Sequence, residues 1–260
     1  MKNKKLLFPL FVLFNSQMVL ADENVIVNDN LSPKTTLTFD NEKNKDVINI
    51  DTNLDEGISL NFYHKFNIPK EGMIFNNKEA KANIIINEVT GNEISFINGN
   101  VRVEGLKAHV IIANPNGIEC HKCSASRVTD FTLMSGKTND SVRDFILSDK
   151  NYVSIRGLKR ISSQKINLIS NKIFMEGTLN KSIDTLNILS GLPIYHLFSK
   201  NEFNHNGQIS FFEGFKHHLK NVDITHGYGE IYLDKDIENL IDKISINNRL
   251  KIKSKLYIGN

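Results

Sequence analysis

Two cysteines three positions apart, Cys120 and Cys123, are the residues whose type and spacing most readily suggest chemistry. Such a pair could work as a redox dithiol or supply two ligands of a zinc site. A redox pair requires a helix amino-terminus that lowers one thiol pKa, and no helical pattern follows Cys123. A zinc site requires two more ligands. His109 and His121 are near in sequence, but no Cys/His spacing of a structural site completes the set.

The other titratable side chains do not form a catalytic or metal-binding set either. His217 and His218 are adjacent, so in a strand their side chains point to opposite faces. Asp234, Asp236 and Glu238 lie in a polar segment that is typical of a solvated loop. No glycine-rich phosphate loop or nucleophile elbow occurs. We therefore predict no enzyme, no metal and no cofactor. A carbohydrate-active β-helix enzyme, which would need acids gathered on one face, remains the alternative.

A strand, a tight turn and a second strand lead directly into the cysteine pair. The apolar run Val110–Ile112 predicts a buried strand. The turn and the start of the next strand consist of Asn114, Pro115, Asn116, Gly117 and Ile118. Proline fixes its own φ and keeps the preceding residue extended, asparagine tolerates unusual backbone, and glycine accepts positive φ. The sequence therefore predicts one well-defined turn conformation here.

Short apolar strand patterns separated by Gly, Asn, Ser and Asp dominate the rest of the chain. In the second half such runs begin every 19 to 23 residues, at Phe145, Ile166, Leu186, Ile209, Ile231 and Leu250. Repeats of this length indicate stacked units that bury their apolar faces against one another. An antiparallel sandwich would require hairpin turns of the Asn-Gly kind between most strands, and few occur. The spacing favours a parallel β-helix.

The first residues have the pattern of an export signal. Three lysines precede an apolar run (Leu6–Leu13), and Ala21 is suited to cleavage, so we predict a signal peptide over residues 1–21. Loss of its three lysines leaves 29 Lys and Arg against 29 Asp and Glu. A formally neutral chain without a basic patch does not indicate a nucleic-acid partner. An exported chain with two cysteines is compatible with a disulfide-permissive compartment.

Three blocks of sequence in a fixed order carry a family resemblance. One block, Ser95–Ile118, contains the turn described above. Upstream of it, a second block contains Asn61, Tyr63, Phe66, Asn67, Gly72, Asn76 and Asn77. A third block contains Asn87, Glu88 and Val89. Together they resemble the amino-terminal two-partner-secretion (TPS) domain of filamentous haemagglutinins and of haemolysins of the Serratia and Proteus type.

The resemblance implies an all-β fold. The implied domain covers residues 22–260 and is a right-handed parallel β-helix, or solenoid, with cap strands at its amino-terminal end. The core family blocks cover about 55–135 and the coil repeats about 145–258. The implied function is a non-enzymatic secretion domain of a haemolysin-type or adhesin-type exoprotein that folds into a β-helix as it leaves the cell. A truncated remnant of a larger haemagglutinin, haemolysin or contact-dependent toxin is the other alternative.

The resemblance also implies a route and partners. The chain would cross the periplasm and outer membrane of a Gram-negative bacterium and become secreted or surface-bound. Its partner would be an outer-membrane TpsB-type β-barrel transporter with periplasmic docking domains, and a host-cell surface is a second candidate. No small-molecule cofactor and no nucleic acid are expected.

Two sites are carried over from the family. Residues 114–118 match its Asn-Pro-Asn-Gly-Ile motif, whose alteration is expected to impair export. We favour a structural turn needed for secretion over direct contact with the transporter. Cys120 and Cys123 match a pair found in the haemolysin branch, which implies a disulfide. A loop of about four residues gives only about 2 kcal/mol in the loop-entropy model, so the bond would act mainly as a local clamp.

Overall fold

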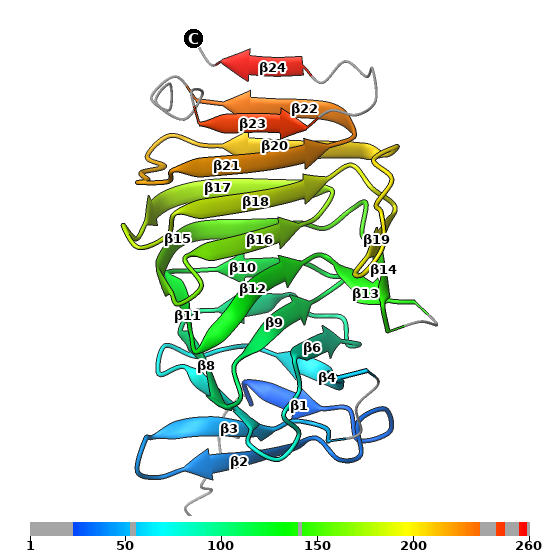
Figure 1. Cartoon of the computed structure of the whole chain (residues 1–260), viewed down its shortest axis with the longest axis vertical. Coiled ribbons are helices and arrows are strands. Elements are labelled where there is room, and N and C mark those ends of the chain that lie inside the picture. The colour runs from blue at the N-terminus through cyan, green and yellow to red at the C-terminus, as the bar shows by residue number, and fades with distance from the viewer. Residues whose placement is uncertain (1–22, 53–55, 140–141, 235–242, 248–254, 259–260) are drawn as a thin grey trace, which may run out of the picture.

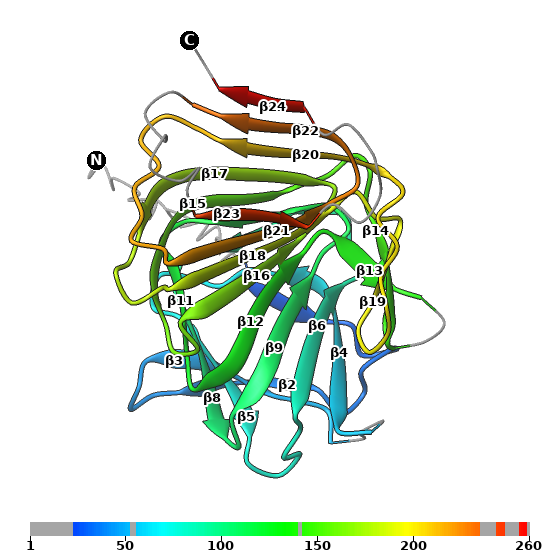
Figure 2. The same ribbon diagram turned by 45° about the horizontal axis from the view of Figure 1, so that its top comes forward.

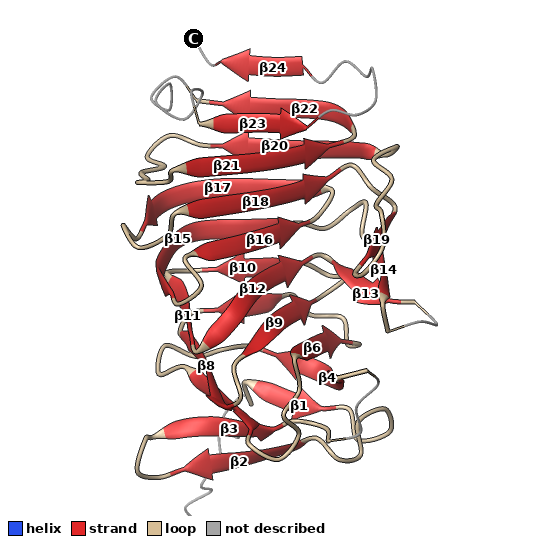
Figure 3. Cartoon of the chain, viewed as in Figure 1, coloured by secondary structure: helices blue, strands red, loops and turns tan. Residues whose placement is uncertain are grey.

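The computed structural model describes residues 23–52, 56–139, 142–234, 243–247 and 255–258. The predicted signal peptide, Asp236, Glu238 and the repeat start at Leu250 lie outside these residues. Every regular element of the described residues is a β-strand (Figure 3). This part of the chain contains no helix that could cross a membrane.

Sheet A forms one wall of the molecule and has nine strands. Its first strand pairs antiparallel with the next, and all later neighbours pair in parallel. In spatial order the strands are β1 (Val25–Val27), β4 (Ile58–Phe66), β6 (Ile84–Val89), β9 (Ala108–Ala113), β12 (Val128–Met134), β16 (Lys165–Ile169), β18 (Thr185–Ser190), β21 (Asn221–His226) and β23 (Ile244–Asn247).

Within the described residues, sheet B has twelve strands. They are β2 (Thr36–Asp40), β3 (Lys45–Asn49), β5 (Met73–Asn77), β7 (Ser95–Ile97), β8 (Asn100–Gly105), β10 (Ile118–Cys120), β11 (Cys123–Ser126), β15 (Val153–Ile161), β17 (Lys172–Leu179), β20 (Asn206–Phe211), β22 (Tyr228–Leu233) and β24 (Lys255–Ile258). Only β2 and β3 pair antiparallel. The chain passes repeatedly from one sheet to the other and rises by one strand each time (Figure 1). The predicted β-helix is therefore confirmed.

Alternating side chains fill the space between the two sheets. In β9, Val110 and Ile112 are fully buried in this main core. The intervening Ile111 and Ala113 are also buried, but they belong to a second cluster. Both faces of this part of sheet A are therefore covered, which explains why the strand is an unbroken apolar run rather than an alternating one.

A small antiparallel sheet, sheet C, packs against sheet A and contributes residues to the second cluster. It consists of β13 (Gly136–Thr138), β14 (Asp144–Leu147) and β19 (Ile194–His196). It lies outside the coil, beside the sheet A strands (Figure 2). Phe145 and Leu147 of β14 pack with Ile111 and Met134 of sheet A. Sheet C thus shields from water an apolar face that a bare coil would expose.

The predicted stacking of the repeats is only partly correct. Ile166 and Leu186 are neighbours on sheet A, as the spacing indicates. Phe145, however, lies in sheet C and pairs antiparallel with Tyr195, so it is not a coil position. Ile209 does not stack on Leu186, because it belongs to sheet B. The reason is physical: both walls bury apolar residues with the same period of two, so the triplets of one wall look like those of the other.

Candidate functional site

The Asn-Pro-Asn-Gly segment is the corner between β9 on sheet A and β10 on sheet B. The Gly117 amide donates to the carbonyl of Asn114 at 3.1 Å and closes the turn. The Asn114 amide donates to the carbonyl of Met134 in the next coil at 3.0 Å. The first residue of the motif is thereby fixed both to its own turn and to its neighbour.

The side chain of Asn114 is fully buried and fully hydrogen-bonded. Its amide nitrogen donates to the carbonyl of Glu93 and to the hydroxyl of Ser95, both at 2.9 Å. Its oxygen accepts the backbone amide of Asn116 at 2.8 Å. A buried amide is tolerated because each of these groups has a partner. No other side chain of this size offers two donors and an acceptor in the same place.

Pro115 and Asn116 are half-buried and connect the corner to the coils on either side. The Asn116 amide nitrogen donates to the carbonyl of Gly91 in the preceding coil at 2.7 Å. The side-chain amide of Asn151, from the following coil, donates to the carbonyl of Pro115 at 2.8 Å. The turn therefore cross-links three successive coils through hydrogen bonds in which backbone or side-chain amides are the donors.

Gly117 and Ile118 continue the chain into β10. Gly117 has φ +115°, and a Cβ there would meet the carbonyl oxygen of Tyr152 at 3.1 Å. A larger residue would be strained by its backbone and crowded as well. Ile118 is fully buried in the main core, and its amide donates to the same Tyr152 carbonyl at 2.9 Å. The motif thus supplies a shape and a register, and it contains no nucleophile, acid or base.

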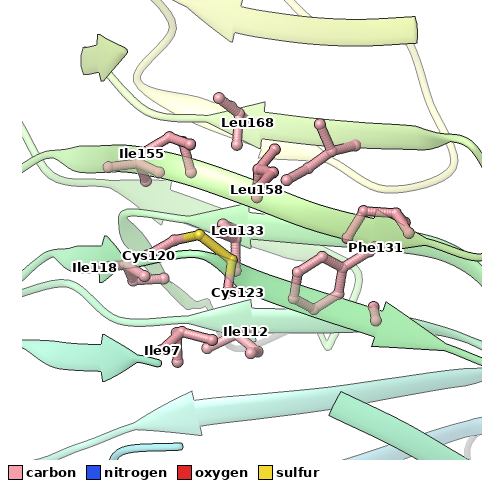
Figure 4. Packing of buried hydrophobic residues seen from close by; sticks show 14 of the residues in the cluster. Ile97, Ile112, Ile118, Cys120, Cys123, Phe131, Leu133, Ile155, Leu158 and Leu168 are labelled. Carbon is pink, nitrogen blue, oxygen red and sulfur yellow. A yellow bond between two sulfur atoms is a disulfide. The ribbon is translucent and has the colours of Figure 1, made fainter. Parts of the chain in front are cut away.

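Cys120 and Cys123 are joined by a disulfide, with their Cα atoms 5.5 Å apart. Both side chains are fully buried, and Figure 4 shows them among Ile97, Ile118 and Leu133 in the main core. The bond spans the turn between β10 and β11. Among the described residues, no three His, Cys, Asp or Glu side chains are grouped so that they could hold a metal ion.

Residues of the second and third blocks form a buried polar network. Asn61 accepts hydrogen bonds from the Thr35 hydroxyl and the Asp51 amide, both at 2.8 Å. The Tyr63 hydroxyl donates to the oxygen of Asn87 at 3.0 Å. Burial raises the pKa of Tyr63 well above its ordinary value, so the phenol keeps its proton. These residues hold β4 and β6 in register.

Phe66 and Asn67 anchor the end of β4. The Phe66 ring lies 4.7 Å from that of Tyr63, measured between centroids, and is buried. The Asn67 oxygen accepts the amide of Phe96 at 2.9 Å. The two side chains therefore fix the same corner of the coil, one by packing and the other by a hydrogen bond.

Gly72, Asn76 and Asn77 have similar structural roles. At Gly72, with φ +86°, a Cβ would come within 2.5 Å of the carbonyl of Asn100. Asn76 donates to the oxygen of Asn49 at 2.9 Å. Asn77 is fully buried, and its amide nitrogen donates to two backbone carbonyls, both at 2.9 Å. These side chains stabilise corners and contact neighbouring coils.

Glu88 has a role that the sequence did not indicate. It is 5% exposed, and one carboxylate oxygen accepts both the amide and the hydroxyl of Thr138, at 2.8 and 2.5 Å. Burial raises the pKa of Glu88, although the two hydrogen bonds from Thr138 oppose the rise. Val89, next to it, is buried in the main core. Glu88 therefore links sheet A to sheet C across 50 positions of sequence.

The three blocks come together as consecutive coils, because β4, β6 and β9 are adjacent in sheet A. Asn61 and Asn87 are paired in register. The sequence did not reveal Ser95 and Asn151 as partners of the turn, since each lies in another coil. A coil period of about 20 to 25 residues could have indicated Ser95, which lies 19 positions before Asn114. It could not have indicated Asn151, which lies 36 positions after Pro115, because the chain between them also forms β13 and β14.

Comparison with known families gives one domain match. A model described as "TPS secretion domain" matches residues 20–248. The chain is 37% identical over 109 residues to a hemolysin of Proteus mirabilis. It is 39% identical over 114 residues to the 16S rRNA endonuclease CdiA of Enterobacter cloacae, and 27% identical over 191 residues to the adenylyltransferase and cysteine protease IbpA of Histophilus somni. The match to the hemolysin spans 7% of that protein and 35% of this chain. The match to CdiA spans 3% of that protein and 35% of this chain, and the match to IbpA spans 5% of that protein and 66% of this chain.

Two solved structures share the fold. The filamentous hemagglutinin secretion domain superposes with a TM-score of 0.66 at 18% identity, covering 92% of this chain and 96% of that one. The HMW1 secretion domain of Haemophilus influenzae gives a TM-score of 0.52 at 16% identity, covering 86% of this chain and 63% of that one. At these identities the likeness concerns the arrangement of the coils.

Proposed function

Since the chain belongs to the family of TPS secretion domains, we propose that an outer-membrane TpsB-type transporter recognises it through periplasmic docking domains. Membership of the family indicates export from a Gram-negative bacterium. The finer route is part of the proposal: residues 1–21 direct the chain through the general secretory pathway, and residues 22–260 form the secretion domain. The domain then remains outside the cell, free or at the surface, where a host cell is a candidate contact.

The buried position of Asn114 supports a structural role for the motif. Its side chain is fully enclosed, so a transporter could touch it only before the coil has formed. After folding, Pro115 and Asn116 are only partly accessible. We propose that residues 114–118 act mainly by fixing the corner from which the next coil starts. Failure of that corner would leave the emerging chain without a template.

The parallel ladders support folding during exit. Each strand of sheet A from β6 onward donates and accepts hydrogen bonds with the strand of the preceding coil. A coil that has just emerged can therefore be added to an edge that already exists. Return to the periplasm would require breaking those ladders. On this proposal folding itself makes export directional, and no nucleotide is needed.

We also propose that this domain is non-enzymatic. The activities named for CdiA and IbpA belong to proteins of which the matched regions make up 3% and 5%. None of those activities is transferred to this chain. A truncated remnant of a larger toxin or adhesin is compatible with the same observations, and nothing favours it over a working secretion domain.

The export assay tests the role of the motif. Asn114→Ala leaves the Asn116 amide and two acceptors of the neighbouring coil without a partner, which costs about 1–3 kcal/mol. We expect this variant to be several-fold less abundant outside cells that carry the partner transporter. The measurement is immunoblotting of the medium and of the periplasm. Asn204→Ala changes an exposed asparagine away from the motif and should be exported normally.

Urea unfolding of the purified variants distinguishes a structural role of the motif from direct recognition by the transporter. If the turn is structural, Asn114→Ala should also lower the urea midpoint of the isolated domain. A variant that is as stable as the wild type yet stays in the periplasm would indicate direct recognition instead. Normal export of Asn114→Ala would remove the motif from the proposal altogether.

A further inference from the structure

The outer face of sheet B carries a column of aromatic rings to which the proposed secretion role assigns no part. In β15, Val153 and Ile155 point into the core, so Ser154 between them faces outward. The ladder places Phe174 beside Ser154 and Ser210 beside Phe174. The strands β10, β15, β17 and β20 that carry this column are stacked in Figure 1.

Three rings from successive coils touch one another on this face. The centroids of Tyr152 and Phe174 are 5.6 Å apart, and those of Phe174 and Phe212 are 5.9 Å apart. Phe212 is 39% exposed. Three large rings gathered at a wet surface form an apolar strip, which usually marks an interaction site.

The strip continues through Glu119 to a further aromatic pair. The Tyr152 hydroxyl donates to one oxygen of Glu119 at 2.8 Å, and His121 lies 3.0 Å from the other oxygen. The His121 ring is in edge contact with Phe96, which is 38% exposed. Burial alone would raise the pKa of Glu119, but the hydrogen bonds from Tyr152 and His121 lower it overall. The carboxylate is thus charged and fixed in orientation.

The rings and polar groups line one groove. Its walls are Glu119, Tyr152, Ser154, Arg156, Phe174 and Glu176, with Phe212 at one end. The Arg156 guanidinium is paired with the Glu176 carboxylate at 2.9 Å, and both groups are about half exposed. The groove therefore offers ring faces alongside hydroxyl, carboxylate and guanidinium groups. Its formal charge is −1, from two carboxylates and one guanidinium.

This composition argues against other classes of ligand. An extended peptide binds by adding a strand to a free sheet edge, but the backbones of β10, β15 and β17 are already paired on both sides. A nucleic acid or an anionic membrane needs a basic surface, and Arg156 is the only cation among the groove residues. An amphipathic helix needs a largely apolar groove, whereas four of the seven lining residues are polar or charged.

We propose that this groove binds an uncharged oligosaccharide chain. Sugar rings have an apolar face of C–H groups that stacks on aromatic rings, and a rim of hydroxyls that pairs with carboxylates and guanidinium groups. From β7 to β20 the strip crosses five stacked strands, or about 20 Å at the strand spacing. An extended glycan lying across the strands would contact the rings in turn. The negative charge of the groove disfavours uronic acids and sulfated sugars.

Titration of the secreted domain with defined oligosaccharides tests the proposal. Chitotetraose and cellotetraose serve as uncharged probes, and a polygalacturonate oligomer serves as the acidic one. We expect saturable binding of at least one uncharged probe, seen by calorimetry and by saturation-transfer NMR from aromatic protons. Phe174→Ser should weaken that binding at least tenfold. Serine suits the position because both register neighbours of Phe174 are serines.

Further variants keep the result interpretable. Phe212→Ser removes an exposed ring just beyond the end of β20 and should also weaken binding, even if Phe174→Ser proves unstable. Phe198→Ser changes an exposed ring outside the groove and should bind as the wild type does. The proposal is overturned if neither uncharged probe binds at millimolar concentration, if only the acidic oligomer binds, or if both groove variants bind normally. The outcome does not depend on export, so it leaves the proposed secretion role untouched.

Discussion

At the scale of single residues, buried asparagines link neighbouring coils, both within the strands and at the corners. Asn61, Asn77, Asn87 and Asn114 are all fully buried, and all bond to groups in another strand or turn. Asn171 accepts the amides of two residues of the next coil, both at 3.1 Å. A carboxamide combines two donors with an acceptor on a short stem, which suits a corner where carbonyls and amides both lack strand partners.

His226 is the buried side chain with the clearest dependence on pH. It is 1% exposed, and neither ring nitrogen has a hydrogen-bond partner within the described part of the chain. Burial lowers its pKa to about 4. The unfolded chain, with a pKa of about 6.5, binds the proton first as the pH falls. The free energy of unfolding should therefore decrease between about pH 6.5 and pH 4, by up to about 3 kcal/mol.

The variant His226→Phe tests this assignment. Urea unfolding at pH 7, 5.5 and 4 should show a smaller loss of stability for the variant than for the wild type. His218→Gln, which changes an exposed histidine, should keep the wild-type slope. Equal slopes for His226→Phe and the wild type would mean that another group controls the acid response.

At the scale of elements, sheet C is attached to the coil by apolar packing and by two carboxylates, those of Glu88 and Glu56. Phe145 and Leu147 cover apolar residues of sheet A, and Glu88 accepts a hydrogen bond from Thr138 at the end of β13. Arg143 adds an ion pair to Glu56 at 2.6 Å, with both side chains partly exposed. An exposed pair of this kind contributes little, so Glu88 is the main polar link.

Glu88→Ala should loosen sheet C without unfolding the coil. The amide and hydroxyl of Thr138 would lose their acceptor, at a cost of about 1–3 kcal/mol. We expect faster amide hydrogen exchange in β13 and β14, while β9 and β12 stay protected. Glu88→Gln keeps an acceptor and should have a smaller effect, whereas Glu79→Ala, an exposed change, should have none.

The pH dependence of this link has the opposite sign to that of His226. The folded pKa of Glu88 is raised, so the folded state holds the proton more tightly than the unfolded chain does. Its contribution to stability is present at low pH and falls as the pH rises through the folded pKa. Glutamine does not titrate, so the stability difference between the wild type and Glu88→Gln should become smaller as the pH rises from 4 to 7. Uniform exchange rates in all of these variants would argue against a special role for Glu88.

The strands themselves were largely predictable, whereas sheet C was not. The run at Val110–Ile112 is a strand, and its unbroken apolar sequence corresponds to burial of both faces. At Val153–Ile155 and Ile173–Met175 the residues that point into the core alternate with residues that face outward, as on a pleated surface. β14 has the same alternation, with Phe145 and Leu147 buried and Ile146 exposed. Nothing local distinguishes it from a coil strand. Its place outside the coil depends on long-range contacts with Met134 and Tyr195.

At the scale of the whole molecule, the main core is one continuous column through the coils. Leu168 lies fully buried near the middle of this column (Figure 4). Leu168→Ala should lower the free energy of unfolding by about 2–5 kcal/mol, because a cavity would remain between stacked side chains. Urea unfolding followed by far-ultraviolet circular dichroism gives the measurement. Phe198→Ala, at a side chain 59% exposed, should change stability by less than about 0.5 kcal/mol.

Cooperativity is the second readout of that experiment. If the column unites the coils, Leu168→Ala should move the midpoint without changing the slope of the transition. Two separate transitions would show that the coils on either side of β16 unfold independently. A loss below 1 kcal/mol would show that the neighbouring side chains close the cavity.

The order of the coils was harder to predict than their existence. A period near 20 residues and the scarcity of hairpin turns indicated a solenoid. The neighbours of each strand depend on how long each coil is. Leu186 stacks on Val222, 36 positions away, because the chain between them leaves sheet A to form β19 and β20. The roles of the motif in export remain predictions, since the hydrogen bonds of a corner do not identify the protein that recognises it.

The detour that carries β19 leaves the coil at Gly191 and returns at His205, whose amide donates to the Gly191 carbonyl at 3.0 Å. The residue at which the chain leaves the coil and the residue at which it returns are thus hydrogen-bonded to each other. We therefore expect the length of the segment between these two residues to have little effect on the register of the strands that follow. Evolution or protein design can therefore insert surface loops of different lengths at this corner while the coil itself stays unchanged.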